Sequence, residues 1–162
     1  MRRIFGKVMN DIIKKDKKVI LCVGDIGYGI FDDVRKNYPK NFYNLGICEQ
    51  SIIGVASGMA LDGLKPWVYT ITPFLIERPF EQVKLDIDQQ KANVKLVGFA
   101  DYPSLGPSHA ELNAKKMMRL FKNIKSYFPK NSSETKKIVY KSYSYNGPSF
   151  ISLKTDRFIN KW

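Results

Sequence analysis

Short apolar segments alternate with segments of helical character along the chain, and this alternation is the feature that most constrains the fold. The clearest segment is VILCV at Val19–Val23, an apolar run that ends at Gly24. A continuous apolar run of this length is typical of a strand buried on both faces of a sheet. Five further strands are predicted at residues 41–46, 66–71, 94–99, 123–128 and 149–153.

The segments between these strands are predicted to be helical. In residues 4–15, Ile4, Val8 and Ile12 recur at a spacing that places them on one side of a helix. Further helices are predicted at residues 31–37, 49–62, 80–89 and 110–121, and a last one is capped by Ser132 or Ser133 and runs toward Tyr145. Strands that alternate with helices indicate βαβ units and parallel pairing. The predicted fold class is α/β, a single domain over residues 1–162 with an open, mostly parallel six-stranded sheet and helices on both faces.

The predicted helix at residues 49–62 has almost no charge, and small or apolar residues surround it on nearly every side. Such a helix is expected to be buried all round. Gly54 and Gly58 lie about one turn apart in it, although glycine lowers helix propensity. The pair therefore predicts that another backbone approaches this helix closely.

The chain is strongly basic, since 27 Lys and Arg residues against 15 Asp and Glu residues give a formal net charge of +12. The basic residues are spread along the sequence without an arginine-rich arm, zinc-finger spacing or an RNA-binding signature, so no nucleic-acid partner is expected. A lysine-coated, solvated surface is the favoured interpretation, and recruitment of an acidic partner or a phosphorylated substrate is the alternative. Two cysteines and one histidine exclude a disulfide framework and a cysteine–histidine zinc site, so no metal ligands are assigned.

Neither a membrane nor an export pathway is indicated by the sequence. No apolar run approaches the roughly 18 residues that a membrane-spanning helix needs. The basic start MRRIFGKVMN is followed by DIIKKDKK rather than by an apolar segment, which is unlike a signal peptide. We expect a cytoplasmic protein.

Residues whose side chains could take part in binding or catalysis follow four of the predicted strands. Asp25 follows the first strand, Glu49 the second, Phe74 and Phe80 the third, and His109 the fourth. In open α/β sheets, ligands bind beyond the carboxyl ends of the strands. These five residues are therefore the candidate site residues.

Each candidate also has an ordinary structural explanation. Glu49 can be a first-turn carboxylate stabilised by the helix dipole, and Asp25 can be a turn residue in GDIG. Phe74 and Phe80 can belong to the core. His109 lies on a glycine- and proline-containing loop, where an imidazole is either simply exposed or a general acid or base. GDIG matches neither the dinucleotide fingerprint nor a P-loop.

Taken together, several stretches resemble the pyrimidine-binding domain of transketolase, a thiamine-diphosphate enzyme. The matching stretches are GDIG, NLGICEQSIIGVASGMALDGLKPWVYTITPFLIERPFEQVKLDI, VKLVGFADYPSLGPSHAE and GPSFISLK, in that order over about residues 19–154. The elements GICEQ, TITPFL and GPSH are the specific ones. The most easily confused relatives are 1-deoxyxylulose-5-phosphate synthase and the β subunits of pyruvate dehydrogenase.

The resemblance implies a role for each candidate residue. Glu49 matches the catalytic glutamate that hydrogen-bonds N1′ of the aminopyrimidine of thiamine diphosphate, a cofactor that carries the difficult chemistry itself. Phe74 matches the aromatic residue that stacks on the pyrimidine, with Phe80 as second choice. His109 matches a catalytic histidine that lines the substrate channel, and Asp25 matches a loop near the cofactor across a dimer interface.

The resemblance does not extend to the diphosphate-binding or C-terminal domains of the family. In the family, a separate domain holds the diphosphate and its Mg²⁺ through a GDG motif with a downstream asparagine, and GDIG is not that motif. The resemblance therefore implies a partner subunit that carries the motif, holds Mg²⁺ and shares thiamine diphosphate, in an α2β2 assembly. The helix at residues 49–62, with its Gly54 and Gly58 face, is the expected contact at the dimer axis.

The function implied by the resemblance is that of a pyrimidine-binding subunit in a split transketolase-like enzyme. Such an enzyme moves a two-carbon ketol unit between sugars or sugar phosphates. Two alternatives remain: a subunit of another split thiamine-diphosphate enzyme, such as a 2-keto-acid decarboxylase or ligase, and a non-catalytic assembly subunit.

Overall fold

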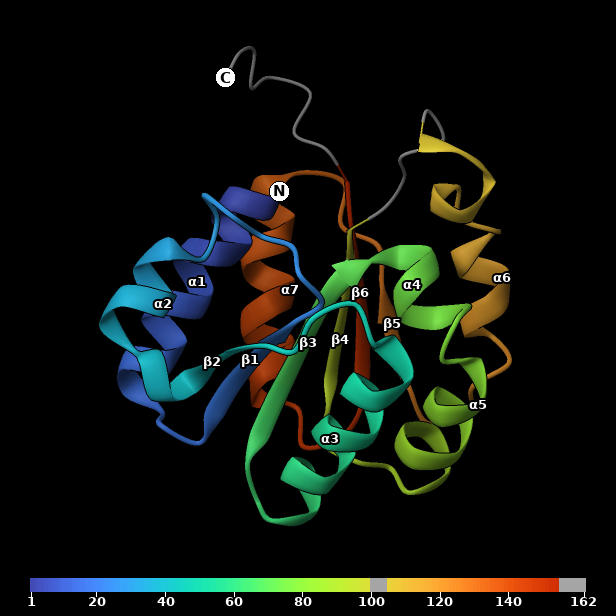
Figure 1. Cartoon of the computed structure of the whole chain (residues 1–162), viewed down its shortest axis with the longest axis horizontal. Coiled ribbons are helices and arrows are strands. Elements are labelled where there is room, and N and C mark those ends of the chain that lie inside the picture. Colours follow the sequence, from blue (N-terminus) through green and yellow to red (C-terminus); the bar gives the residue numbers. More distant parts are fainter. Residues whose placement is uncertain (100–104, 155–162) are drawn as a thin grey trace.

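The computed structural model describes residues 1–99 and 105–154, which form a six-stranded sheet between two layers of helices (Figure 1). The strand order is β2-β1-β3-β4-β6-β5, and every neighbouring pair is parallel. The strands are β1 (Val19–Val23), β2 (Phe42–Asn44), β3 (Lys65–Ile71), β4 (Lys95–Phe99), β5 (Lys125–Tyr127) and β6 (Ser149–Leu153). The predicted α/β fold with six parallel strands is confirmed.

The helices divide between the two faces of the sheet. One face is covered by α1 (Arg2–Lys15), α2 (Asp32–Asn37) and α7 (Ser132–Ser144). The other is covered by α3 (Glu49–Leu61), α4 (Thr72–Ile76), α5 (Phe80–Gln82) with a π-helical continuation (Val83–Gln89), and α6 (Ala114–Met118). Short 3₁₀ turns lie at Pro39–Asn41 and Pro107–His109.

Two hydrophobic cores result, because successive side chains of a strand point to opposite faces of the sheet. Leu21 and Val23 of β1 belong to the core under α1 and α7, whereas Ile20 and Cys22 belong to the core under α3. All five residues of β1 are buried. The sequence-based prediction of a strand buried on both faces is thus correct.

The carboxyl end of β2 leads through residues 45–48 into α3, and that of β3 runs directly into α4. The helix α4 was not among the helices predicted from the sequence. Pro73 lies in the first turn of α4, where a missing backbone N–H costs no helical hydrogen bond. The two prolines of the segment therefore allow a short helix at the carboxyl end of β3.

The predicted helix at residues 110–121 is shorter than expected. The side chain of Asn113 accepts a hydrogen bond from the Lys116 backbone N–H and caps α6, which begins only at Ala114. After Met118 the chain tightens into turns, and the backbone N–H groups of Lys122 and Asn123 donate to the Asp88 carboxylate. A local side-chain cap therefore limits the start of the helix, and hydrogen bonds to the sequence-distant Asp88 hold the chain just after its end.

The helix α3 is not buried all round within the chain. Ile52, Ile53 and Ala56 face the sheet, but Val55 and Leu61 are 43% and 69% exposed. Apart from the adjacent residues and backbone of α3 itself, no atom of the described chain lies within 4 Å of a Cβ built on Gly54 or Gly58. The expectation of a helix buried on every side is therefore wrong for the single chain, and within the described residues no other backbone approaches the two glycines.

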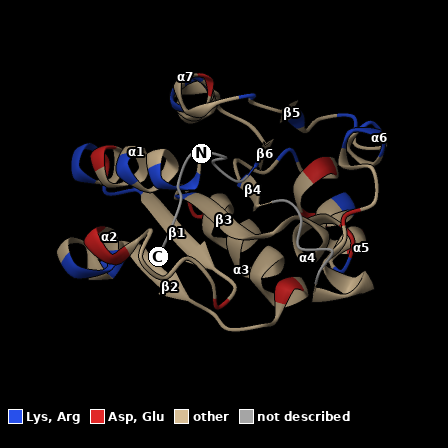
Figure 2. Cartoon of the chain, turned by 90° about the horizontal axis from the view of Figure 1, so that it is seen from above, with Lys and Arg blue, Asp and Glu red and all other residues tan. Residues whose placement is uncertain are grey.

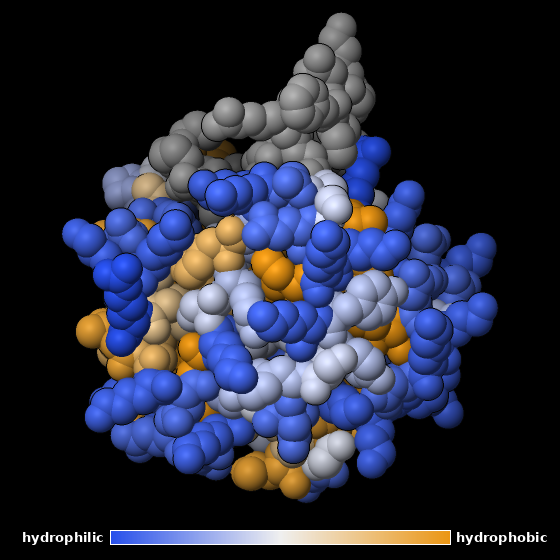
Figure 3. Space-filling model, turned by 180° about the vertical axis from the view of Figure 1, so that it is seen from behind, coloured by the Kyte–Doolittle hydropathy of each residue, from blue (hydrophilic) through white to orange (hydrophobic). Residues whose placement is uncertain are grey.

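The charged residues lie mainly on the outer helices. Figure 2 shows Lys and Arg on α1, α2, α6 and α7, whereas α3 contains none. The side of the molecule seen in Figure 3 is largely hydrophilic, with only small hydrophobic patches. Within its layer, α3 carries no basic residue, whereas α6 carries Lys115 and Lys116.

Candidate active site at the carboxyl edge of the sheet

Glu49 lies at the first position of α3, just after β2, and its side chain is 6% exposed. A carboxylate at this position is stabilised by the partial positive charge of the helix N-terminus. Nη1 of Arg78 donates to both carboxylate oxygens, at 3.2 and 3.3 Å. Glu49 is therefore a nearly buried anion whose charge is balanced by one partly exposed cation.

Phe74 connects this ion pair to His109. The guanidinium carbon of Arg78 lies 3.6 Å from the centroid of the Phe74 ring. The His109 ring meets Phe74 edge to face, with 4.8 Å between ring centroids and 72° between ring planes. We call Glu49, Phe74, Arg78 and His109 the Glu49 cluster. The chain brings together residues from β2–α3, α4 and the segment after β4, as expected for the carboxyl edge of a parallel sheet.

The turn that carries His109 is held against the end of α4. Glu77 accepts a hydrogen bond from the Leu112 backbone N–H at 2.8 Å. Gly106, with φ of +103°, takes a left-handed conformation and accepts the His109 backbone N–H. Nδ1 of His109 lies 3.1 Å from Oγ of Ser108, so the second ring nitrogen, Nε2, is the one left for a ligand.

Asp25 lies in a second group, at the end of β1. Its carboxylate accepts hydrogen bonds from Nδ2 of Asn44 and from the Tyr28 hydroxyl, each at 2.9 Å. These two hydrogen bonds lower the pKa of the Asp25 carboxyl group, and the one from Asn44 has the larger effect. Oδ1 of Asn44 accepts the backbone N–H groups of Asp25 and Gly46. Asn44 thus joins the loop after β1 to the loop that leads into Glu49.

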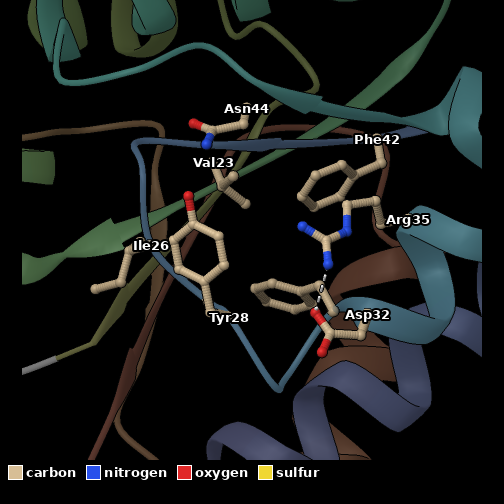
Figure 4. Close-up of a pocket in the computed structure, with 9 residues that line it drawn as sticks. Val23, Ile26, Tyr28, Asp32, Arg35, Phe42 and Asn44 are labelled. Carbon is tan, nitrogen blue, oxygen red and sulfur yellow. Dashed lines mark hydrogen bonds and ion pairs between the residues drawn. The ribbon is translucent and has the colours of Figure 1, made fainter.

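A small cavity lies beside this second group, between β2 and α2. Figure 4 shows Tyr28 and Phe42 along its wall and Arg35 paired with Asp32, with a nitrogen–oxygen distance of 3.4 Å. Its volume is about 70 Å³. Ligand sites usually enclose about 300–1,000 Å³, so this cavity is too small to hold a cofactor.

Phe80 contacts a different part of the molecule. Its ring packs on Phe121, with 5.3 Å between centroids, in the core beneath α3. Its described contacts are those of a core residue rather than of the Glu49 cluster. Sequence analysis missed Arg78 and Asn44. The only sequence signal for either residue was its position: Asn44 lies inside the predicted strand at residues 41–46, and Arg78 is the cation nearest to Phe74 in the sequence.

The described part of the chain offers no metal-binding cluster of side chains. Within residues 1–99 and 105–154, no group of three or more His, Cys, Asp or Glu side chains could hold a metal ion. In the same two ranges, no helix is both long and apolar enough to span a membrane.

The sequence and the fold both match known proteins. The family described as "Transketolase, pyrimidine binding domain" matches residues 1–158. The chain is 38% identical over 121 residues to one subunit of the apulose-4-phosphate transketolase of Actinobacillus succinogenes, and 29% identical over 154 residues to the corresponding subunit from Phocaeicola vulgatus. These matches cover 73% and 93% of this chain but only 39% and 49% of the relatives.

Two solved structures share the fold. One, described as "Split gene transketolase, inactive beta4 tetramer", has a TM-score of 0.85 and 28% identity over 94% of this chain and 50% of its own. The other, transketolase from Campylobacter jejuni, has a TM-score of 0.82 and 18% identity over 94% of this chain and 25% of its own. Because the family match extends over residues 1–158, the chain belongs to the transketolase pyrimidine-binding domain family.

Proposed function

We propose that this chain supplies the pyrimidine-binding half of a thiamine diphosphate site in a transketolase-type enzyme. The enzyme transfers a two-carbon ketol unit between sugar phosphates. The observation that carries the proposal is the Glu49 cluster, in which a nearly buried carboxylate, an aromatic ring and a histidine meet at the carboxyl edge of the sheet. The two relatives named as apulose-4-phosphate transketolase subunits support a sugar phosphate as substrate.

The residues present fit an aminopyrimidine. The guanidinium of Arg78 is a planar group with N–H donors, and it already lies on the Phe74 ring and against the Glu49 carboxylate. In the proposed site Glu49 hydrogen-bonds N1′ of the cofactor and Phe74 stacks on its pyrimidine. Phe80 remains the second choice for stacking. Thiamine diphosphate, when bound, supplies the carbanion chemistry that the protein lacks.

The other two candidates have roles at the rim of this site. His109 presents its imidazole toward Phe74 and lines the channel to the reacting carbonyl, where it can donate or accept a proton. Asp25 lies at the same edge of the sheet, in the loop after β1, and contributes to the cofactor site across a subunit interface. Its bonds to Asn44 keep that loop beside the segment that leads to Glu49.

The proposed enzyme is complete only with a partner subunit. Two relatives are named as transketolase subunits and one structural neighbour as a split-gene transketolase, which supports assigning the diphosphate and its Mg²⁺ to a partner that carries a Gly-Asp-Gly motif and a downstream asparagine. The α2β2 assembly places the uncharged outer face of α3 at an interface. Gly54, Val55, Gly58 and Leu61 lie on this outer face, and the side chains of Val55 and Leu61 are exposed in the single chain. Burial of such apolar surface is what stabilises subunit association.

The test is to purify the tagged chain from its own cells and to measure the mass of the complex and its bound thiamine diphosphate. The complex should transfer a two-carbon unit from a ketose phosphate to an aldose phosphate. Activity on a 2-keto acid instead would indicate the decarboxylase or ligase alternative. Undiminished partner activity without this chain would indicate an assembly role.

Glu49→Gln in this complex should lower turnover by at least about a hundredfold, because an amide cannot exchange a proton with N1′ of the cofactor as a carboxyl group can. Asp62→Asn is the matched control, since it makes the same chemical change at the exposed C-cap of the same helix. It should leave turnover near the wild-type value. Full activity of the Glu49→Gln complex would contradict the proposed role of Glu49.

A further inference from the structure

Arg78 makes two contacts that the proposed function assigns to the cofactor. Its Nη1 atom donates to both oxygens of Glu49, and its guanidinium carbon lies over the Phe74 ring, 3.6 Å from the ring centroid. The aminopyrimidine of the cofactor is proposed to hydrogen-bond the same carboxylate and to stack on the same ring. Two planar groups cannot occupy that one position together.

We propose that the guanidinium of Arg78 holds the pyrimidine position of the site and must move out of it before thiamine diphosphate binds. This inference rests on the proposed function. Arg78 and the aminopyrimidine then compete for Glu49 and Phe74, so Arg78 sets how tightly the cofactor is held.

The chemistry of the guanidinium explains why it can take this position. It is planar, always charged at neutral pH, stacks on aromatic faces and donates to carboxylates. Glu49 is only 5% exposed, and a carboxylate buried without a positive partner is unfavourable. Arg78 therefore provides a positive partner for Glu49 and covers Phe74, which is 8% exposed.

The geometry also explains how Arg78 can leave. Its side chain is 40% exposed, whereas that of Glu49 is 6% exposed. A single nitrogen is shared between the two oxygens, in place of the two parallel hydrogen bonds of a full arginine–carboxylate fork. Among the described residues, Glu49 is the only ion-pair partner of Arg78. The adjacent Glu77 carboxylate instead accepts a hydrogen bond from the Leu112 backbone N–H. The guanidinium can therefore turn outward into solvent.

The competition has a measurable consequence for cofactor affinity. If only a fraction of the molecules has Arg78 turned outward, the apparent dissociation constant rises in inverse proportion to that fraction. A partly exposed ion pair contributes little free energy, so the Arg78–Glu49 pair is a weak competitor of the cofactor. Removing the Arg78 guanidinium should therefore tighten the binding of thiamine diphosphate by about two- to fivefold. If Arg78 instead helped to bind the cofactor, its removal would weaken the binding of thiamine diphosphate.

The experiment is calorimetric titration of thiamine diphosphate, with Mg²⁺ present, into the complex of this chain with its partner subunit. Arg78→Met keeps most of the side-chain length but removes the charge and the planar donors. It should bind thiamine diphosphate about two- to fivefold more tightly than wild type. Arg119→Met makes the same change at an exposed position in the turn after α6, and should leave the dissociation constant unchanged.

A second pair of variants tests whether the competition acts through Glu49. A glutamine at position 49 is a much weaker partner for a guanidinium than a carboxylate. In a complex with Glu49→Gln, the further change Arg78→Met should therefore tighten binding by less than in wild type. An equal gain in both backgrounds would show that Arg78 acts through something other than Glu49, and would overturn the inference.

The remaining outcomes separate this inference from the proposed function. Equal or weaker binding by the Arg78→Met complex, with normal binding by wild type, would overturn the inference and leave the proposed function intact. A wild-type complex that binds no thiamine diphosphate would end both. If the Arg78→Met chain does not assemble with its partner, Arg78→Lys replaces it in the experiment. Lysine keeps the charge but has no planar group to stack on Phe74. The Arg78→Lys complex should therefore also bind thiamine diphosphate more tightly than wild type, but by a smaller factor than expected for Arg78→Met.

Discussion

The amine of Lys95 is buried at the start of β4, where its residue is 1% exposed. Its Nζ atom donates to the carbonyl oxygens of Tyr145 and Gly147, at 2.7 and 2.5 Å. Burial, followed by the nearby charges of Lys65 and Lys125, lowers the pKa of Lys95 from 10.5 to about 7. The unfolded chain therefore binds more protons than the folded chain between about pH 7 and pH 10.5, and stability must rise with pH in that window.

Lys95→Met should remove this contribution to the pH dependence. Between pH 7.5 and 8.5, the free energy of unfolding of wild type should rise relative to that of Lys95→Met by up to about 1.4 kcal/mol. Urea titrations at several pH values measure this difference. The lowered pKa of the Met1 amino group, to about 6, is common to both proteins and cancels. Parallel pH profiles for the two proteins would show that Lys95 titrates as it does in the unfolded chain.

The sequence located part of the candidate site and missed part of it, for a physical reason. Glu49, Phe74 and His109 follow predicted strands, and parallel strands bring their carboxyl ends to one edge, so their proximity could be expected. Arg78 could not be found this way, because its partner Glu49 is 29 residues away and the turn between α4 and α5 directs the side chain. The roles of these residues in binding and catalysis stay predictions.

Asn131 acts at the scale of one element, the helix α7. Its side chain accepts the Glu134 backbone N–H at 2.9 Å, and the Glu134 carboxylate accepts the Lys130 backbone N–H at 2.7 Å. The sequence-based choice of Ser132 or Ser133 as the cap is therefore wrong by one or two residues. Asparagine caps helices as well as serine does, and these two hydrogen bonds hold the first turn of α7, which begins at Ser132.

Asn131→Ala should lower the free energy of unfolding by about 1 kcal/mol, because the Glu134 N–H loses its acceptor. Ser133→Ala is the control at an exposed neighbour inside the helix, and should change stability by less than about 0.5 kcal/mol. Chemical denaturation of the three proteins measures both effects. A larger loss from Ser133→Ala than from Asn131→Ala would contradict the observed cap.

The elements were predicted most reliably where burial decides them. Both predicted strands at residues 19–23 and 149–153 have the observed bounds, because apolar runs between two helical layers can form little else. The order of the strands was not predicted, since it depends on long-range pairing. The helix at residues 80–89 has the predicted extent, but its second part is π-helical, and the Ser57 hydroxyl donates to the Asp86 carbonyl there.

At the scale of the whole molecule, the distribution of charge separates two kinds of surface. The helices α1, α2, α6 and α7 carry lysines and arginines that favour water, and the side of the molecule seen in Figure 3 is mostly hydrophilic (Figures 2 and 3). By contrast, α3 has no basic residue and exposes Val55 and Leu61. Although the net charge of the chain is +12, the outer face of α3 carries no basic residue. A partner can therefore bury the apolar side chains of this face at little electrostatic cost.

Gly58→Leu tests this interface, because the chain alone should tolerate the change. The space around Gly58 is open, and leucine is a better helix former than glycine, so the isolated chain should gain up to about 1 kcal/mol of stability. In the complex, the larger side chain should prevent close approach at α3, and the mass measured by light scattering should fall to that of separate subunits. Lys136→Leu, on the exposed side of α7, is the control and should leave the complex assembled. An intact complex with Gly58→Leu would show that the partner binds elsewhere.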